Sequence, residues 1–367
     1  MSHDKPVHVV HLVYAFSVGG LERIIANVIN HLPAESYHHT IIALTQVDTD
    51  FMLAEELNCE FYALHKAPGT SVKLHGKVFR LLRKIKPQVL QTYNLACVEF
   101  HPIAFLAGVP VRIHAEHGRD INDPSGSNNK YKLLRRVASW FTHHVIAVSL
   151  DLHQWLINEV KVSARKAKLI LNGVDTQCYQ PVSTERYPPL VFGHVARLSP
   201  IKNQHNLIAA YAQACTTDSQ FARNTQLSVV GDGELSETLQ QQVASLASDI
   251  NVRLQGQRHD MPQVYQAFDV FVLSSDAEGI PMTMLEAMAS GLPVLSTNVG
   301  GIPAIVTAQS GFLLEPQSID ALAKGFLSMY AYRSQWQKMG KAARERIIEQ
   351  FSQQKMLADY AMLYQGR

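Results

Sequence analysis

The sequence predicts two α/β domains, each with a parallel β-sheet covered by helices on both faces. Three observations lead to this prediction. Short apolar runs alternate with helical stretches along most of the chain, as is typical of βαβ units. The length of 367 residues suits two domains of about 150–200 residues each. A segment rich in proline and polar residues, 181–189, separates the two halves.

The strands of the first domain are predicted from continuous apolar runs, which are expected where a parallel sheet is buried on both faces. A helical pattern of apolar positions follows the first of them, at 21–32. The expected strands are 7–14, 40–44, 59–64, 89–92, 111–115, 144–148 and 168–171.

Two segments of the first domain follow strand ends, where open α/β sheets bind ligands. Gly19 and Gly20 come after the first strand and precede a helix, so they form either a phosphate-approach loop or a tight turn. After the fifth strand, the chain presents Glu116, His117, Gly118, Arg119 and Asp120, which favours a functional loop.

The segment 72–86 (VKLHGKVFRLLRKIK) predicts a basic amphipathic helix. Such a helix either lies on an anionic membrane surface or packs on the sheet with its lysines in solvent. Binding to a membrane surface would bear on which substrate the protein acts on.

The second domain shows the same alternation of strands and helices. Its expected strands are 190–195, 227–230, 252–254, 270–273 and 294–296, and its later helices are 261–268, 282–289, 321–330, 334–351 and 354–364. Arg197 and Lys202 lie in the loop after the first of these strands, and such paired cations suit a diphosphate.

The most informative stretch is 274–300, SSDAEGIPMTMLEAMASGLPVLSTNVG. Glu278 precedes a helix in which Pro281 is expected at the first position, and Glu286 lies inside that helix. Unpaired N–H groups at a helix start favour an anion, and carboxylates beside it can accept hydrogen bonds from hydroxyls. The pattern indicates a sugar nucleotide.

Composition limits the alternatives. The chain is 47% hydrophobic and has a net charge of +2, so it has ample material for cores and we expect no nucleic-acid partner. Its four cysteines have no CxxC spacing, which indicates neither zinc nor disulfides and favours a reduced, cytoplasmic setting. No run reaches about 18 apolar residues, so a membrane span is not expected. The start of the chain has a first strand's pattern and not that of a signal peptide.

Taken together, these motifs resemble glycosyltransferase family 4, the retaining enzymes of the GT-B fold. The resemblance covers nearly the whole chain, and its most specific part is the Glu-x7-Glu element EGIPMTMLE, from Glu278 to Glu286. SVGGLE, AEHGRD and NGVD also resemble sugar transferases of exosortase-associated exopolysaccharide gene clusters. The other matching elements are Gly19-Gly20, the NGVD of 172–175, Arg197 and Lys202.

The resemblance implies two Rossmann-like, doubly wound domains that face a cleft. It implies an acceptor-side domain at 1–178, a nucleotide-sugar-binding domain at 179–350, and a C-terminal helix at 351–367 that crosses back to the first domain. The expected activity is sugar transfer from a UDP- or GDP-sugar to a glycan or polyprenyl-linked acceptor in polysaccharide biosynthesis. No cofactor and no metal are expected. Peripheral association with the inner face of the cell membrane, through 72–86, stays open.

The resemblance also implies roles for individual residues. Glu278 would bind donor-sugar hydroxyls and Glu286 the ribose, while Arg197 and Lys202 would bind the diphosphate. His117 would lie near the transferred sugar and is, with Glu278, Arg197 and Lys202, a catalytic candidate. The remaining donor-binding candidates are Gly19, Gly20, Arg258, and the backbone of Gly279, Ile280, Pro281, Met282 and Thr283. The acceptor-side candidates are Arg119, Asp120 and Asn172. The sequence departs from the family at Ala304, where a glutamate is common, and no role is expected for it.

The expected mechanism stabilises the leaving diphosphate with cations and helix-start N–H groups, without a carboxylate nucleophile. Two alternatives remain open. One is a sugar-nucleotide epimerase of the same fold, and the other is a catalytically silent, sugar-nucleotide-binding subunit of a polysaccharide complex.

Overall fold

The structure is a computed structural model of the chain, and it describes residues 5–17, 19–48, 59–67, 69, 72–120, 123, 125–182 and 187–366. The chain divides into two compact units. Unit 1 comprises 1–172 and 354–367, and unit 2 comprises 173–353. The boundaries expected from the sequence, after residues 178 and 350, lie close to these. Part of the expected linker, 183–186, lies outside the described residues.

Unit 1 contains a seven-stranded parallel sheet in the order β3-β2-β1-β4-β5-β6-β7. Its strands lie close to the seven predicted runs, although the last is shorter than expected. They are β1 (Val7–Val13), β2 (Tyr37–Ala43), β3 (Cys59–Ala63), β4 (Val89–Tyr93), β5 (Val111–Glu116), β6 (His144–Ala147) and β7 (Ala167–Leu169).

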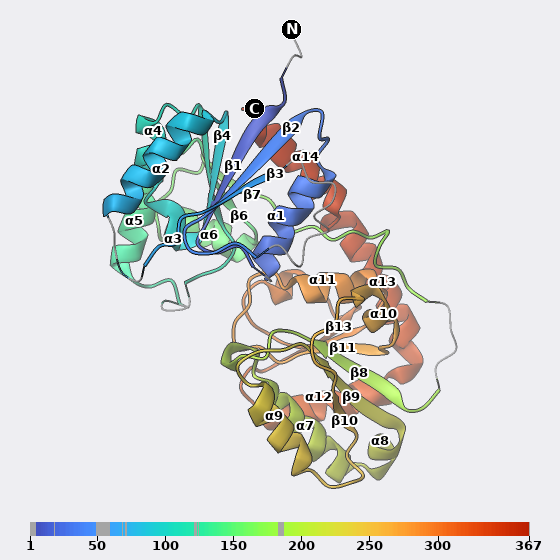
Figure 1. The fold of residues 1–367 in the computed structure, drawn as a ribbon. Helices are drawn as coiled ribbons and strands as arrows, with labels where there is room; N and C mark the ends of the chain where they lie inside the picture. The colour runs from blue at the N-terminus through green and yellow to red at the C-terminus, as the bar shows by residue number, and fades with distance from the viewer. Residues whose placement is uncertain are drawn as a thin grey trace. The chain divides into compact units, whose positions relative to one another are not determined.

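Helices cover both faces of this sheet (Figure 1). On one face lie α1 (Gly20–His31) and α14 (Gln353–Tyr364), whose Tyr364 hydroxyl donates to Oε1 of Gln91 on β4 at 2.6 Å. On the other lie α2 (Val72–Ile85), α4 (His101–Leu106) and α5 (Asn129–Ser139). The unit also contains α3 (Asn94–Val98) and α6 (Leu150–Asn158).

The amphipathic helix α2 packs its apolar stripe against the sheet. Val78 and Leu82 are buried beside Val10, Leu12 and Leu90. The basic side chains of α2 lie on its exposed side. Burial of the stripe explains the 3.6-residue spacing of its apolar positions.

Unit 2 contains a six-stranded parallel sheet in the order β10-β9-β8-β11-β12-β13. The strands are β8 (Leu190–Val195), β9 (Thr225–Val230), β10 (Val252–Leu254), β11 (Val270–Leu273), β12 (Val294–Thr297) and β13 (Gly311–Leu314). The edge strand β13 was not predicted from the sequence, because four apolar residues carry no periodicity that separates a strand from other buried backbone.

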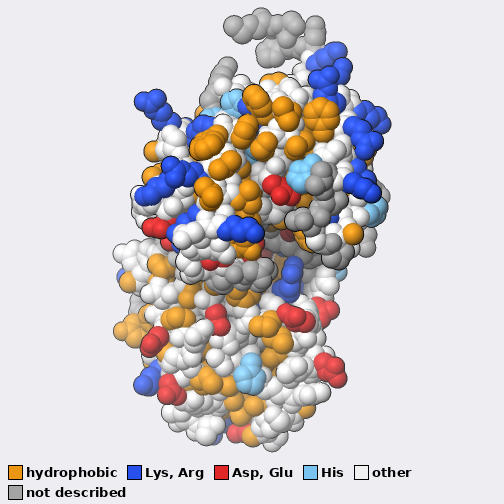
Figure 2. Space-filling model, turned by 90° about the vertical axis from the view of Figure 1, so that its left-hand side faces the viewer, with side chains coloured by type: hydrophobic (Ala, Val, Ile, Leu, Met, Phe, Trp, Pro, Cys, Tyr) orange, Lys and Arg blue, Asp and Glu red, His pale blue; other side chains and the backbone are white. Residues whose placement is uncertain are grey.

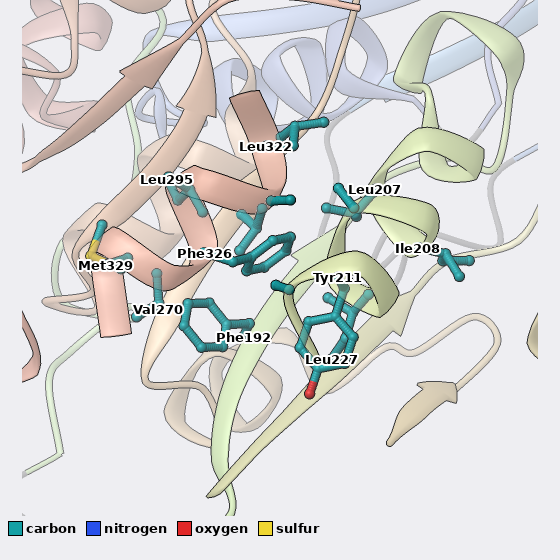
Figure 3. Packing of buried hydrophobic residues seen from close by; sticks show 14 of the residues in the cluster. Phe192, Leu207, Ile208, Tyr211, Leu227, Val270, Leu295, Leu322, Phe326 and Met329 are labelled. Carbon is teal, nitrogen blue, oxygen red and sulfur yellow. The ribbon is translucent and has the colours of Figure 1, made fainter. Parts of the chain in front are cut away.

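The core of unit 2 lies between its sheet and two long helices, α7 (Gln204–Thr217) and α12 (Ile319–Ala331). Figure 3 shows Phe326 of α12 between Phe192 of β8 and Tyr211 of α7, with ring centroids 5.2 and 5.4 Å away. The remaining helices are α8 (Ser219–Asn224), α9 (Ser236–Ala244), α10 (Met261–Gln266), α11 (Met282–Ala289) and α13 (Trp336–Gln350), and the 3-10 turns are η2 (Pro200–Lys202), η3 (Ile302–Ala304) and η4 (Arg333–Gln335).

In both sheets the strand order reverses beside the first strand of the unit. The reversal lies between β1 and β4 in unit 1 and between β8 and β11 in unit 2. Ligands of open α/β sheets bind outside the carboxyl ends of the strands at such points. Among the described residues no helix is long and apolar enough to cross a bilayer.

Candidate donor-binding and catalytic site

In unit 2, an ion pair joins the loops that follow the two strands at this reversal. Lys202, after β8, lies with its Nζ 2.5 Å from Oε1 of Glu278, after β11. The hydroxyl of Ser275 donates to the same oxygen at 2.6 Å. The side chains of Glu278 and Lys202 are 7% and 23% exposed. The structure thus brings together two residues that the sequence assigned to sugar and phosphate.

The loop that carries Glu278 is held by hydrogen bonds from residues that the sequence analysis did not single out. Asn203 donates from Nδ2 to Oδ1 of Asp276 at 2.9 Å, and Thr297 donates from its hydroxyl to the carbonyl of Ser275 at 2.6 Å. Ser274 donates to the carbonyl of Lys202 at 2.9 Å. The sequence contains no indication of these hydrogen bonds, because polar residues in a loop have no regular spacing that predicts their partners.

Two glycines after β12 also position this loop. Gly300 has a φ of +53°, and a Cβ there would lie 1.7 Å from the carbonyl oxygen of Glu278. A Cβ on Gly301 would lie 2.3 Å from the carbonyl oxygen of Gly279, to which the Gly301 N–H donates at 3.1 Å. Only glycine permits this backbone contact. A glycine pair after a strand is the signal that could have identified them.

Helix α11 starts with N–H groups that no side chain caps. Pro281 is its N-cap, with extended backbone (φ −70°, ψ 119°), and the helix begins at Met282. The prediction of Pro281 at the first helical position was therefore wrong by one residue, because its ψ is extended. The side chains of Ile280, Pro281 and Met282 are buried, whereas Gly279 and Thr283 are half-buried. A ligand at this helix start would meet backbone N–H groups, which favour anions.

Glu286, on the second turn of α11, is almost completely buried, with 3% exposure. The hydroxyl of Tyr265 on α10 donates to its Oε2 at 2.6 Å. Burial of a carboxylate is unfavourable unless it is paired or hydrogen-bonded, and Tyr265 supplies a donor. The sequence analysis did not single out Tyr265.

Arg197 follows β8 in an exposed position. Its backbone is fixed by the side chain of Gln204, which donates to the Arg197 carbonyl at 2.9 Å. On either side, Gly231 and Gly233 approach the carbonyls of Ala196 and Leu198, to which added Cβ atoms would come within 1.9 and 2.4 Å. The close packing of the Arg197 loop against them therefore explains why both positions are glycine.

Arg258 follows β10 at the same edge of the sheet. Its guanidinium forms an ion pair with Asp260 and donates to Oε1 of Gln255 at 3.1 Å. The Gly256 carbonyl nearby accepts from the N–H of Gly231. Arg258 is thus engaged by its own loop and lies beside the turn at Gly231.

In unit 1, Gly19 and Gly20 form the start of α1. Gly19 is the N-cap, with no side-chain cap, and its carbonyl accepts from Arg23. Gly20 has no described atom within 4 Å of the place of a Cβ, and its φ is not positive. The fold itself does not require glycine at Gly20, and the phosphate-approach loop stays a prediction.

His117 follows β5, near the strand reversal in unit 1. Its backbone N–H donates to Oδ1 of Asn94 at 2.8 Å, and its ring packs 5.6 Å from that of Tyr93. Burial lowers the pKa of His117 to about 3, although the adjacent Glu116 opposes this effect. Neither ring nitrogen has a hydrogen-bond partner among the described residues. A neutral imidazole with unsatisfied nitrogens is available for a ligand hydroxyl.

Glu116 itself lies beneath this loop. Burial raises its pKa, but Arg135 and His114 outweigh burial and lower the pKa to about 2. Nε of Arg135 lies 2.5 Å and Nε2 of His114 3.0 Å from its Oε1. Glu116 is therefore a structural anion rather than a proton donor at neutral pH.

The acceptor-side candidates Arg119, Asp120 and Asn172 lie in unit 1. Arg119 forms an ion pair with Asp151 at 2.9 Å and lies over the ring of Trp155. Asp120 accepts the N–H of Asp123 through its carbonyl, and Asn172 is buried at the last residue of the unit's first segment. Arg119 and Asp120 are close to His117 in the sequence, but their contacts in the structure are with Asp151 and Asp123.

Comparison with known proteins identifies the family. The model "Glycosyltransferase Family 4" matches residues 18–177, and "Glycosyl transferases group 1" matches residues 179–346. The UDP-Gal:alpha-D-GlcNAc-diphosphoundecaprenol alpha-1,3-galactosyltransferase of Escherichia coli is 28% identical over 96% of this chain and 94% of its own length. The capsular polysaccharide glycosyltransferase CapM of Staphylococcus aureus is 25% identical over 78% and 79% of the two chains.

Solved structures of the same fold agree with this result. The Anabaena protein HepE, solved with UDP-glucose, superposes with a TM-score of 0.80 at 22% identity over 98% of this chain and all of its own. TarM superposes with a TM-score of 0.76 at 13% identity over 99% of this chain and all of its own. These similarities show the fold.

Proposed function

Because the chain belongs to glycosyltransferase family 4 and has the GT-B fold, we propose that it transfers a sugar, with retention of anomeric configuration, from a UDP- or GDP-sugar to a glycan or polyprenyl-linked acceptor. The observation that carries the proposal is the contact of Lys202 with Glu278 beside the uncapped start of α11. The donor and acceptor named for the Escherichia coli relative, UDP-Gal and a diphosphoundecaprenol-linked sugar, support these substrate classes.

In this proposal the diphosphate binds at the start of α11. Lys202, Arg197 and the first N–H groups of the helix stabilise the negative charge that grows on the leaving phosphate. Glu278 accepts hydrogen bonds from sugar hydroxyls, and Glu286 accepts them from the ribose. Within unit 1, Gly19 and Gly20 are proposed as phosphate-binding groups, and His117 is proposed to bond a hydroxyl of the transferred sugar.

The two carboxylates of the Glu-x7-Glu element, Glu278 and Glu286, are poor nucleophiles. Glu278 is held by Lys202 and Ser275, and Glu286 by Tyr265. We therefore propose front-face substitution. The bond from the anomeric carbon to the phosphate oxygen breaks, with its electron pair on the phosphate, and the acceptor oxygen bonds the same face. The acceptor's proton passes to the leaving phosphate, so the step needs neither a protein nucleophile nor a metal.

Transfer to a polyprenyl-linked acceptor would bring the protein to a membrane surface. The basic residues of α2 support peripheral association with an anionic membrane. The apolar side chains of α2 are packed on the sheet, so only its basic side chains are available to bind a membrane.

The test is product analysis with a panel of UDP- and GDP-sugars, a polyprenyl-diphosphate-linked acceptor, and EDTA throughout. We expect one glycoside whose anomeric configuration, read by NMR, is that of the donor. Glu278→Gln should lower turnover by about 100-fold or more, since the site loses a charge matched to the transition state. The exposed Glu237→Gln is the matched control and should keep wild-type turnover.

Other products would contradict the proposal in distinct ways. A changed sugar with donor alone would indicate an epimerase, and donor binding without any product would indicate a silent subunit. Inversion would contradict retention, and activity that requires magnesium would contradict metal independence.

A further inference from the structure

We propose that unit 1 binds an anionic lipid bilayer through an exposed apolar patch formed by α4, α5 and the residue after α5. We call it the α4–α5 patch. It comprises Phe105, Leu106, Leu133, Leu134 and Trp140, whose exposures are 53%, 67%, 59%, 37% and 67%. The inference deepens the proposed membrane association, and it adds the apolar contact that α2 lacks.

The orientation of α5 is the first observation. On this helix Arg135 is buried against Glu116, with 3% exposure, whereas its neighbours Leu133 and Leu134 point outward. A surface helix in water normally shows the opposite arrangement, with leucines inside and arginine outside. Leu133 and Trp140 lie seven residues apart and share one side of the helix. The outward side of α5 thus presents two leucines to solvent beside the exposed Lys130 and Arg136.

Continuity of the patch is the second observation. Helix α4 is packed between α2 and α5. Its Phe105 contacts Phe141, which follows Trp140, with ring centroids 5.7 Å apart. Single exposed apolar residues are common, but a contiguous group marks a surface that binds something apolar. Figure 2 shows hydrophobic side chains gathered on this face of unit 1 with Lys and Arg side chains on both flanks.

Charge identifies the partner. The sequences of α2, α4 and α5 contain no Asp or Glu. Of the acids beside these helices, Glu159 forms an ion pair with Lys132, and Glu99 lies 3.6 Å from the imidazole of His75. An apolar centre with a basic rim matches acyl chains beneath anionic headgroups, and Trp is favoured at that interface. The exposed basic residues around the patch are Lys73, Lys77, Arg80, Arg83 and Lys84 of α2 and Lys130 and Arg136 of α5.

The same charge argues against a second copy of the chain as the partner. In a two-fold symmetric dimer, the patch of one copy would face the patch of the other. The basic rims would then oppose each other without compensating acids. A bilayer with anionic lipid satisfies both the apolar centre and the rim.

The experiment is co-sedimentation of the full-length protein with vesicles of phosphatidylcholine containing 30% phosphatidylglycerol, without donor or acceptor. We expect binding that is absent with phosphatidylcholine alone and decreases with salt. Leu106→Ser with Leu133→Ser should weaken binding by about tenfold or more, because side chains that enter the interface are lost. Lys77→Glu with Arg83→Glu should also weaken it. The controls, Ile348→Ser and Lys338→Glu on exposed sites of α13, should bind as the wild type.

Trp140 gives a direct readout. On vesicle binding its emission should shift to the blue and be quenched by brominated lipids, and Trp140→Phe should remove both signals while binding remains. Trp155 is buried, and Trp336 donates to the Met329 carbonyl, so neither should respond.

Three results would overturn the inference. They are no vesicle binding, binding that the two serine substitutions leave unchanged, and a soluble dimer or protein complex that these substitutions dissociate. Because no sugar is present, failure here leaves the proposed sugar transfer untouched. Failure of transfer likewise leaves vesicle binding to be measured.

Discussion

Glycines of this chain differ in what surrounds them. Gly300 and Gly301 touch the backbone of Glu278 and Gly279, whereas Gly20 has open space at its Cβ position. The first two serve the fold of the Glu278 loop, and Gly20 leaves room for a ligand at the start of α1. Structure thus separates glycines that the fold requires from one that it does not, although they look alike in the sequence.

A pair of alanine substitutions tests this distinction. Gly300→Ala should lower the free energy of unfolding by about 2 kcal/mol or more, because a Cβ would clash with a carbonyl at positive φ, and it should also weaken donor binding. Gly20→Ala should change stability by no more than about 1 kcal/mol but weaken donor binding. Urea unfolding and donor titration measure both effects. Unchanged donor affinity in Gly20→Ala would remove Gly20 from the site.

At the element scale, the sheet of unit 1 holds an unusual number of buried histidines. His11 contacts Tyr93 and His39 at 2.7 and 3.0 Å, and His101 shares the hydroxyl of Thr92 with His114, each at 2.7 Å. Burial lowers the pKa of His11 and of His101 well below the usual value, and that of His39 to about 4. The rings of His11, His39 and His101 are therefore neutral in the folded protein at pH 5.5 and above.

This burial predicts loss of stability in mild acid. Below pH 6.5 the unfolded chain takes up protons on these histidines and the folded chain does not, so the free energy of unfolding falls as the pH falls. Between pH 7.5 and 5.5 we expect a loss of about 1 kcal/mol for each of His11, His39, His101 and His117. Urea unfolding at the two values measures it. Equal stability at both would contradict the buried, neutral assignment.

Much of the element order could be predicted from the sequence, because strands buried on both faces are continuous apolar runs. Strands β8, β10 and β11 have the predicted bounds, and helix α11 begins one residue after the expected first position at Pro281. The outward side of α5 could not be predicted, since only the structure shows that Arg135 pairs with the buried Glu116. The N-cap position of Pro281 depends on its ψ, which the sequence does not determine.

At the scale of the whole molecule, the site is predicted from residues that lie far apart in the sequence. Arg197, Lys202 and Glu278 could be proposed as site residues because they follow strand ends, and Glu286 because of its Glu-x7-Glu spacing from Glu278. The structure brings the Lys202 and Glu278 side chains into contact, which the sequence did not predict. Supporting residues such as Ser275 and Tyr265 were not identifiable, because a hydroxyl near a carboxylate is a property of the fold and has no spacing in the sequence.

The central claim is that unit 2 binds a nucleoside diphosphate sugar through α11 and the loops beside it. A thermal-unfolding panel of UDP- and GDP-sugars tests it most directly, since a ligand that binds only the folded state raises its melting temperature. At saturating concentration we expect one of them to raise the melting temperature by several degrees. Lys202→Ala and Glu286→Gln should lose the shift, and Glu237→Gln should retain it. A panel without any shift, or a shift that both site variants retain, would contradict the claim.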